Sequence, residues 1–498
     1  MMQPPFRLIP LATALAVLSA PVNAGVLEDA SETLTLRQLE NVNYHRFRGY
    51  DAAALPDGGF ALIWAEDYRY NDYKDSVILQ RFDASGNASG EALTLFQTDI
   101  DQATNHFRHP AVAADEDGDL VVAWSTPGDH CYGDLFVQTL DGDGDWSNLP
   151  APTLVSAKGC EPRLAMDADG DFALTWRDRT GLRYQDTNSL LRTYSANGIE
   201  LQNEPIRLVQ EEANFAPTPV LAMQPDGEFM VAWQQDDSDF LFAQRFNIDG
   251  NTLDSTPKRL DNGALRDENS RQLTPALSTY GDDGYIAFWS ERTTYTAPNV
   301  EAVEIRGLRW HADGTPGREL TAGDGYNTSF LSYENITTPT VSVDSAGNVL
   351  VAWRSKVFDS LPDTKLTVFD DRLNIAELEQ PYVNPSEFND SDTRFNFGAK
   401  LVMSNDRGIL IWARHDQDDG QSKRLLGRIL PTLIEAKEPV EEEPVEEAPI
   451  EENSSDDTSN DAEVPNDNGG GGSSGGAGGP WLLSLLALLG IRRWMHTS

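Results

Sequence analysis

The chain has 498 residues, enough for several domains, although an all-β repeat fold of this length can form one unit. It carries 80 acidic against 38 basic side chains, a formal net charge of −42. This excess excludes nucleic acid as a partner, because a phosphate backbone needs a basic surface. The acidity either keeps the protein in solution or attracts divalent cations.

The N-terminal segment predicts export. Arg7 supplies a positive charge, and residues 8–20 form an apolar run too short to span a membrane. Val22-Asn23-Ala24 then offers the small residues that a signal peptidase recognises. We therefore expect a signal peptide over residues 1–24 and a mature protein that starts near Gly25.

A repeat then occupies most of the chain. Tryptophan recurs every 52 to 64 residues at the end of an apolar run, and in five of the seven copies a glycine lies six residues before it, as in Asp117-Gly118 before Trp124. Asp-Gly between two apolar runs is typical of a β-hairpin, because the tight turn needs positive φ. The seven tryptophans are Trp64, Trp124, Trp176, Trp233, Trp289, Trp353 and Trp412.

Two further strands follow each hairpin. The third ends in a frame such as Gln80-Arg81-Phe82, with a glycine four residues on, and a weaker apolar segment such as residues 91–95 comes next. The second strand is apolar on both faces, so its sheet must be covered on both sides. Seven sheets of four antiparallel strands predict an all-β fold, a seven-bladed β-propeller over residues 25–432, with few helices.

The ends of the repeat region predict how the ring closes. The last repeat has only three strands, whereas residues 32–36 nearly duplicate the fourth strand of the first repeat. We expect residues 32–38 to pair with residues 425–430, because closure of this kind removes exposed strand edges.

The repeat frame resembles repeats that are common in large secreted and surface proteins of Gram-negative bacteria and cyanobacteria. The resemblance covers about residues 45–430, and that repeat family carries no agreed activity. It implies a surface or extracellular location and leaves the ligand open. We expect a monomer.

The composition changes after the repeats. Residues 433–479 are first rich in glutamate, aspartate and proline and then in glycine and serine, so we expect a disordered acidic stalk and a flexible joint. Residues 480–498 predict a short hydrophobic helix that ends in Arg492 and Arg493.

Gly478 and Gly479, the apolar segment and the arginine pair resemble the GlyGly-CTERM sorting tail. The resemblance implies a rhomboid-type sorting protease and the type II secretion machinery as partners, and transient anchoring in the inner membrane. About twelve apolar residues span only about 18 Å of a hydrocarbon core of about 30 Å. We therefore expect cleavage near residues 475–479, and the alternative is an ordinary C-terminal anchor.

Two features offer sites. Cys131 and Cys160 are the only cysteines, and in an oxidising compartment they predict a disulfide, with two free thiols as the alternative. Asp141, Asp143 and Asp145 alternate along an acidic turn as calcium ligands do, but aspartate and glycine also suit plain turns, and no EF-hand glutamate follows. We expect no other cofactor.

The sequence contains no motif for a serine or cysteine nucleophile and no zinc-protease motif. We expect a binding or scaffold protein, displayed on the cell surface, whose propeller loops contact a protein or glycan. The alternative is a polysaccharide-active hydrolase at the central channel, because 80 acids always offer a carboxylate pair.

Overall fold

A computed structural model describes the repeat region of the chain. The residues that it describes are 32–39, 45–68, 73–100, 109–128, 133–142, 146, 149, 151–179, 187–209, 218–234, 240–263, 270–282, 284–295, 300–328, 338–357, 363–383, 398–404, 407–415 and 422–430. The expected signal peptide at 1–24, the linker at 433–479 and the tail at 480–498 lie outside these residues. In the described part, no helix is long and apolar enough to cross a membrane.

All regular elements of the described residues are strands, which the blades use in chain order. Blade 1 holds β2 (His45–Ala54), β3 (Phe60–Tyr68), β4 (Tyr73–Phe82) and β5 (Ala88–Ile100); blade 2, β6 (Ala111–Ala114), β7 (Leu120–Ser125), β8 (Leu135–Leu140) and β9 (Thr153–Ser156); blade 3, β10 (Gly159–Met166), β11 (Phe172–Arg179), β12 (Thr187–Tyr194) and β13 (Ile206–Arg207); blade 4, β14 (Val220–Met223), β15 (Phe229–Gln234), β16 (Leu241–Phe246) and β17 (Lys258–Arg259).

The remaining strands form three blades. Blade 5 holds β18 (Ser270–Thr279), β19 (Gly284–Tyr295), β20 (Val300–His311) and β21 (Pro316–Thr328); blade 6, β22 (Thr340–Val343), β23 (Val349–Val357), β24 (Asp363–Phe369) and β25 (Ile375–Val383); blade 7, β26 (Lys400–Ser404), β27 (Arg407–His415), β28 (Ser422–Leu430) and β1 (Leu34–Gln38).

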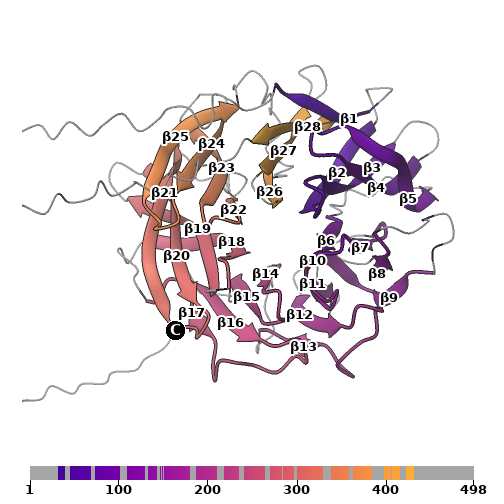
Figure 1. The fold of residues 1–498 in the computed structure, drawn as a ribbon, viewed down its shortest axis with the longest axis horizontal. Coiled ribbons are helices and arrows are strands. Elements are labelled where there is room, and N and C mark those ends of the chain that lie inside the picture. Colours follow the sequence, from indigo (N-terminus) through magenta and orange to yellow (C-terminus); the bar gives the residue numbers. More distant parts are fainter. Residues whose placement is uncertain are drawn as a thin grey trace, which may run out of the picture. The chain divides into compact units, whose positions relative to one another are not determined.

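The blades surround a central axis, with the first strand of each blade innermost (Figure 1). The protein is therefore the seven-bladed β-propeller of four-stranded antiparallel blades that the repeat predicts. Ring closure is also as predicted: β1 pairs with β28 in antiparallel register, with Leu34 opposite Gly427 and Gln38 opposite Arg424. Blade 7 thus combines strands from both ends of the repeat region, in the order β1-β28-β27-β26.

The hairpin turns follow from local chemistry. In blade 2, Gly118 takes φ 88°, and the carboxylate of Asp115 accepts the backbone N–H groups of Asp117 at 3.0 Å and Asp119 at 2.8 Å. Such a side-chain cap stabilises the turn without any ion. In blade 6 the glycine of the second turn is missing, and Leu373 takes the left-handed conformation instead, with φ 61°.

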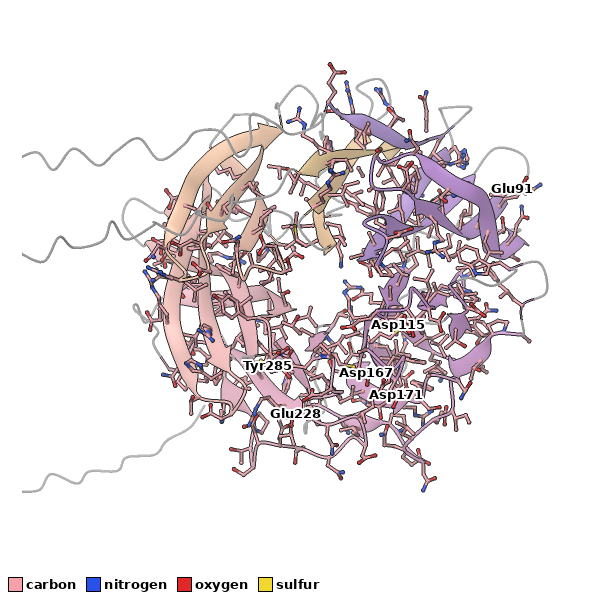
Figure 2. The ribbon with its side chains drawn as sticks, in the orientation of Figure 1. Glu91, Asp115, Asp167, Asp171, Glu228 and Tyr285 are labelled. Carbon is pink, nitrogen blue, oxygen red and sulfur yellow. The ribbon has the colours of Figure 1, made fainter. Side chains whose placement is uncertain are left out.

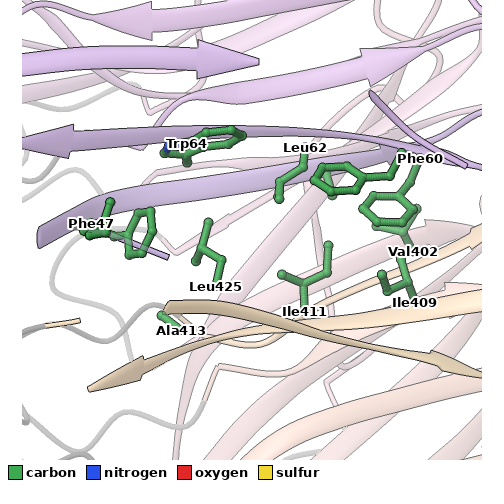
Figure 3. Packing of buried hydrophobic residues seen from close by; sticks show 12 residues of the cluster. Phe47, Phe60, Leu62, Trp64, Val402, Ile409, Ile411, Ala413 and Leu425 are labelled. Carbon is green, nitrogen blue, oxygen red and sulfur yellow. The ribbon is translucent and has the colours of Figure 1, made fainter. Parts of the chain in front are cut away.

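The core lies between blades. On β7, Leu120, Val122 and Trp124 pack with residues of blade 1, whereas Val121 and Ala123 on the opposite face pack with residues of blade 3. The junction of the first and last blades has the same form, with β3 of blade 1 against β27 of blade 7 (Figure 3). This burial on both faces explains why the second strand has no polar side.

One repeated position also joins neighbouring blades by hydrogen bonds. Arg81, at the end of the third strand of blade 1, donates to the carbonyl of Gly142 in blade 2. The corresponding Thr193 of blade 3 donates to Ile248 of blade 4, and Arg245 of blade 4 donates to Ala312 and Asp313 of blade 5. The arginine of the repeat frame therefore has a structural role, since it links its blade to the next blade's turn.

Blades 5 and 6 depart from the regular pattern. The end of β21 pairs in parallel with the end of β23, with Tyr326 opposite Lys356, so the two blades form one eight-stranded sheet. The indole of Trp353 donates to the carbonyl of Asp324 at 3.0 Å across this joint. Because β21 is long enough to reach the next blade, the joint forms there.

Candidate functional site: one mouth of the central channel

The two ends of the ring differ in their connections. Because the strands of a blade alternate in direction, the turns between first and second strands and between third and fourth strands lie at one end, the turn face. The other end, the mouth face, receives the connections between second and third strands and between blades. The link from Val383 to Lys400 is an example of these longer connections, whereas Phe82 to Ala88 is typical of the turn face.

A cavity of about 580 Å³ lies on the axis of the ring. Residues of the innermost strands of all seven blades line it, most of them alanine, valine, leucine, proline or threonine. Titratable side chains in its lining come from four blades, at the mouth face: Asp51, His109, Glu161, Arg163 and Lys400.

Strand register places these residues at equivalent positions. Asp51, Ala111, Arg163, Val220, Ala276, Thr340 and Lys400 each lie opposite the residue before the blade tryptophan. We call this set the first ring. Two residues earlier come Gly49, His109, Glu161, Thr218, Thr274, Thr338 and Gly398, which we call the outer ring. His109 and Glu161 are exceptional among its glycines and threonines.

Glu161 has an unusual backbone. Its φ is 53°, a conformation that residues with a Cβ seldom adopt, and β10 carries a β-bulge between Cys160 and Arg163. Left-handed conformations at such residues cost about 1 kcal/mol or more and persist where the surroundings hold them. The bulge lets the strand continue past Pro162 at the mouth of the channel.

The Glu161 carboxylate is held from two sides. Arg177 of the same blade lies 3.2 Å from it, and the hydroxyl of Thr218 in blade 4 donates to its other oxygen. Burial alone would raise the pKa of Glu161, but Arg177, His109, Thr218 and Arg163 together lower it to about 2. Glu161 is therefore ionised at neutral pH and has no proton to give.

His109 and Arg163 complete this side of the mouth. Burial, and then the charge of Arg163, lower the pKa of His109 to about 4, so its imidazole is neutral at pH 7. Arg163 donates to the carbonyl of Pro162 at 2.8 Å, and no carboxylate of the described residues forms an ion pair with it. Its guanidinium therefore has donors to offer a ligand.

In the adjacent blades, Asp51 of blade 1 pairs with Lys400 of blade 7 at 2.6 Å. The other oxygen of Asp51 accepts the N–H of Val112 in blade 2 at 3.2 Å. Thr340 plays the same part between blades 6 and 7, since its hydroxyl accepts the N–H of Leu401 at 3.2 Å. Side chains of the first ring can thus accept backbone N–H groups from the innermost strand of the next blade.

The mouth can bind and orient a polar group, but its described carboxylates are poor proton donors. Glu161 is ionised and Asp51 is engaged by Lys400 and Val112. Acid catalysis of glycoside hydrolysis needs a carboxyl group with a raised pKa. Burial raises the pKa of Asp178 and of Glu291, which lie near the mouth-face ends of β11 and β19, but neither residue lines the cavity. Asp167, whose pKa rises to about 6, lies in a turn at the other end of the ring.

The predicted metal ligands are only partly described. Asp141 lies in the second turn of blade 2, where the indole of Trp146 donates to its carbonyl at 3.0 Å, and Asp143 and Asp145 lie outside the described residues. No group of three potential ligands that could hold a metal ion occurs in the described part of the chain. The calcium hypothesis stays a prediction.

Cys160 lies directly before Glu161 and is disulfide-bonded. Cys131, the only other cysteine of the sequence, lies outside the described residues, so the pairing of the two stays a prediction. The sorting-tail residues Gly478, Gly479, Arg492 and Arg493 also lie outside them.

Sequence reasoning missed the charged mouth. A usable signal was present, because five blades carry a residue followed by proline at the start of the first strand, and only His109 and Glu161 there are not threonine. An alignment of the seven repeats on this proline would have singled out both residues.

No family model and no curated protein matches this chain. Solved structures with a similar arrangement include a protein of unknown function from Dyadobacter fermentans (10% identity, 81% of this chain and 98% of that chain, TM-score 0.45). Another is the polysaccharide lyase Uly1, with 8% identity over 81% of this chain and 99% of that chain and a TM-score of 0.46. A third is the phage phi92 endosialidase, with 10% identity over 84% of this chain and 71% of that chain and a TM-score of 0.41. Similarities at this level carry no argument about function.

Proposed function

We propose that this protein is an exported, surface-displayed binding protein, and that its ligand binds at the mouth of the propeller channel. One observation carries the proposal: four blades bring Asp51, His109, Glu161, Arg163 and Lys400 to the same end of one cavity. Polar groups that converge in a cavity of a few hundred Å³ are typical of ligand sites. The described strand ends that the longer connections join lie at the same face.

Binding is preferred to catalysis because Glu161 is kept ionised in a strained conformation by partners from two blades. Such an arrangement fixes a charge in place. A hydrolase stays the alternative, and a screen must therefore record cleavage as well as binding.

Gly398 offers a variant that blocks the mouth. A Cβ added there would meet the Cβ of Thr338 at 3.5 Å, an ordinary contact, and the backbone needs no positive φ. Gly398→Ala should therefore be tolerated, whereas Gly398→Trp fills the mouth. The full chain is screened on a glycan and protein array for binding and for release of products.

We expect binding that Gly398→Ala preserves and Gly398→Trp abolishes, with no released product. A ligand bound equally by both variants would place the site elsewhere and refute the proposal. Product release that Gly398→Trp abolishes would establish the hydrolase instead.

Export and display are tested separately by mass spectrometry of the protein from its host. We expect a mature N-terminus near Gly25 and a C-terminus within residues 475–479. Protein that retains His496-Thr497-Ser498 would show that the tail is a permanent anchor.

A further inference from the structure

Unlike Asp51 and Thr340, its equivalents in blades 1 and 6, Arg163 makes no hydrogen bond to a neighbouring blade within the described residues. In the first ring, Asp51 and Thr340 accept an N–H from the next blade, and Ala111, Val220 and Ala276 are small or apolar. An arginine cannot accept a hydrogen bond. Its place on the cavity wall is therefore not explained by contacts between blades.

Among the described charged groups at the mouth, one positive charge has no ion-pair partner. Lys400 is paired with Asp51, and Arg177 is paired with Glu161. Arg163 forms no ion pair with a carboxylate of the described residues. The neutral state of His109 adds no further positive charge. One guanidinium, with planar paired donors suited to a carboxylate, is thus available at the mouth.

The rest of the wall suits a sugar. Thr338 and Thr340 contribute hydroxyl groups, beside alanine and proline. The ring of Tyr50 packs in the core between blades 1 and 7, and its hydroxyl donates to the carbonyl of Gly398 at 2.8 Å. The chain's net charge of −42 opposes a ligand with many negative charges, because such a ligand is repelled wherever it lies beyond the mouth. A single negative charge, placed at Arg163, avoids this repulsion.

From these observations we propose that the ligand is a glycan unit with one carboxylate, which Arg163 binds through its guanidinium. This inference rests on the proposed function, since it specifies what the channel mouth binds. Thr218 and Arg177 each hold one oxygen of the Glu161 carboxylate. The charge of Arg163 also lowers the pKa of Glu161, but the two side chains form no ion pair among the described residues.

The test uses the full chain and a matched pair of probes, an oligosaccharide with one glucuronic acid and the methyl ester of the same oligosaccharide. Affinities are measured by calorimetry for the wild type and for Arg163→Gln, which removes the charge and keeps hydrogen-bond donors. Arg318→Gln is the matched control, because Arg318 is an exposed arginine whose described partners are the carbonyl of Arg372 and the side chain of Asn374.

We expect the acid to bind at least 10-fold more tightly than the ester. Arg163→Gln should weaken acid binding by about 10- to 100-fold, the range of a charge-assisted hydrogen bond, and leave the ester unaffected. Arg318→Gln should behave as the wild type.

Equal affinity for acid and ester, or discrimination that survives in Arg163→Gln, overturns the inference. If Gly398→Trp still abolishes binding of both probes in that case, the mouth remains the binding site and only its preference for an acid is refuted. Tighter binding of a peptide with a single glutamate than of the acidic oligosaccharide would overturn the assignment to a glycan.

Discussion

Two arginines, one at each face of the propeller, differ in how many partners they have. At the turn face, Arg245 is fully engaged: it pairs with Asp254 at 3.0 Å and donates to two carbonyls of the next blade. At the mouth face, Arg163 donates only to a neighbouring carbonyl among the described residues. An arginine of a repeat protein can thus either link neighbouring blades or be available to bind a ligand. The number of hydrogen-bond and ion-pair partners that it has within the protein distinguishes the two roles.

The largest expected effect is on the turn face. Arg245→Met removes the guanidinium from the buried carboxylate of Asp254, which keeps Lys258 and the backbone N–H of residue 245 as partners. It also removes the two hydrogen bonds from Arg245 to blade 5 and leaves the one from Lys258 to Gly314. We expect a loss of about 3–5 kcal/mol in the free energy of unfolding, because breaking a buried pair strands a charge. Denaturant titration measures it. Arg318→Met, at an exposed arginine of the same face, should change stability by less than about 0.5 kcal/mol, and similar losses in both variants would contradict this account.

A second test concerns the predicted disulfide at the mouth face. The predicted bridge between Cys131 and Cys160 would close a loop of about 30 residues, worth about 3–4 kcal/mol on the chain-entropy model. The double variant Cys131→Ala/Cys160→Ala should lose about that much stability. Thiol titration of the denatured, unreduced protein is the control, and two reactive thiols per chain would disprove the bridge.

Asp115 and Asp167 lie in the turns of neighbouring blades (Figure 2). Burial raises the pKa of Asp167 to about 6. The backbone N–H of Asp171 lowers this pKa, whereas the negative charge of Asp171 raises it further. A carboxyl whose pKa is higher folded than unfolded stabilises the fold when protonated. The contribution is complete below about pH 4 and is lost as the pH rises through about 6.

Asp167→Asn should therefore stabilise the protein by about 1–2 kcal/mol at pH 7.5 and have little effect at pH 3.5, because asparagine can still cap the turn. Urea titrations of both proteins across this pH range measure the difference. A gain that is independent of pH would show that the effect does not come from ionisation.

The smallest effect concerns the backbone of Glu161. Glu161→Ala and Glu161→Gly both remove the carboxylate, but only glycine relieves the positive φ. The glycine variant should be more stable than the alanine variant by about 1 kcal/mol. Equal stability of the two would mean that the strain is absent in solution.

The sequence predicts those parts of the fold that depend on local chemistry. Gly118 needs positive φ, and Trp124 ends a strand apolar on both faces, so the turn and the packing between blades follow from a few residues. Closure by β1 is predictable because Leu34 and Leu36 repeat a strand pattern found elsewhere in the chain.

The mouth is less predictable because it depends on register between distant strands. Glu161 meets Thr218 only after blades 3 and 4 have packed together, and Asp51 meets Lys400 only after the ring has closed. The bulge at Cys160 shifts the register of β10 around Pro162, which has no N–H to pair. The same proline occurs in other blades, so it does not by itself predict the left-handed backbone of Glu161. The parallel joint between β21 and β23 likewise depends on where two long strands end.

The position of β28 has a mechanical consequence. Any load on the chain beyond Leu430 is transmitted first to β28, which lies between β1 and β27 and is hydrogen-bonded to both. A strand at the edge of a blade could be peeled away one bond at a time, whereas β28 must break two ladders. A propeller held in flowing medium by the chain that follows Leu430 would therefore be attached through a strand that resists tension.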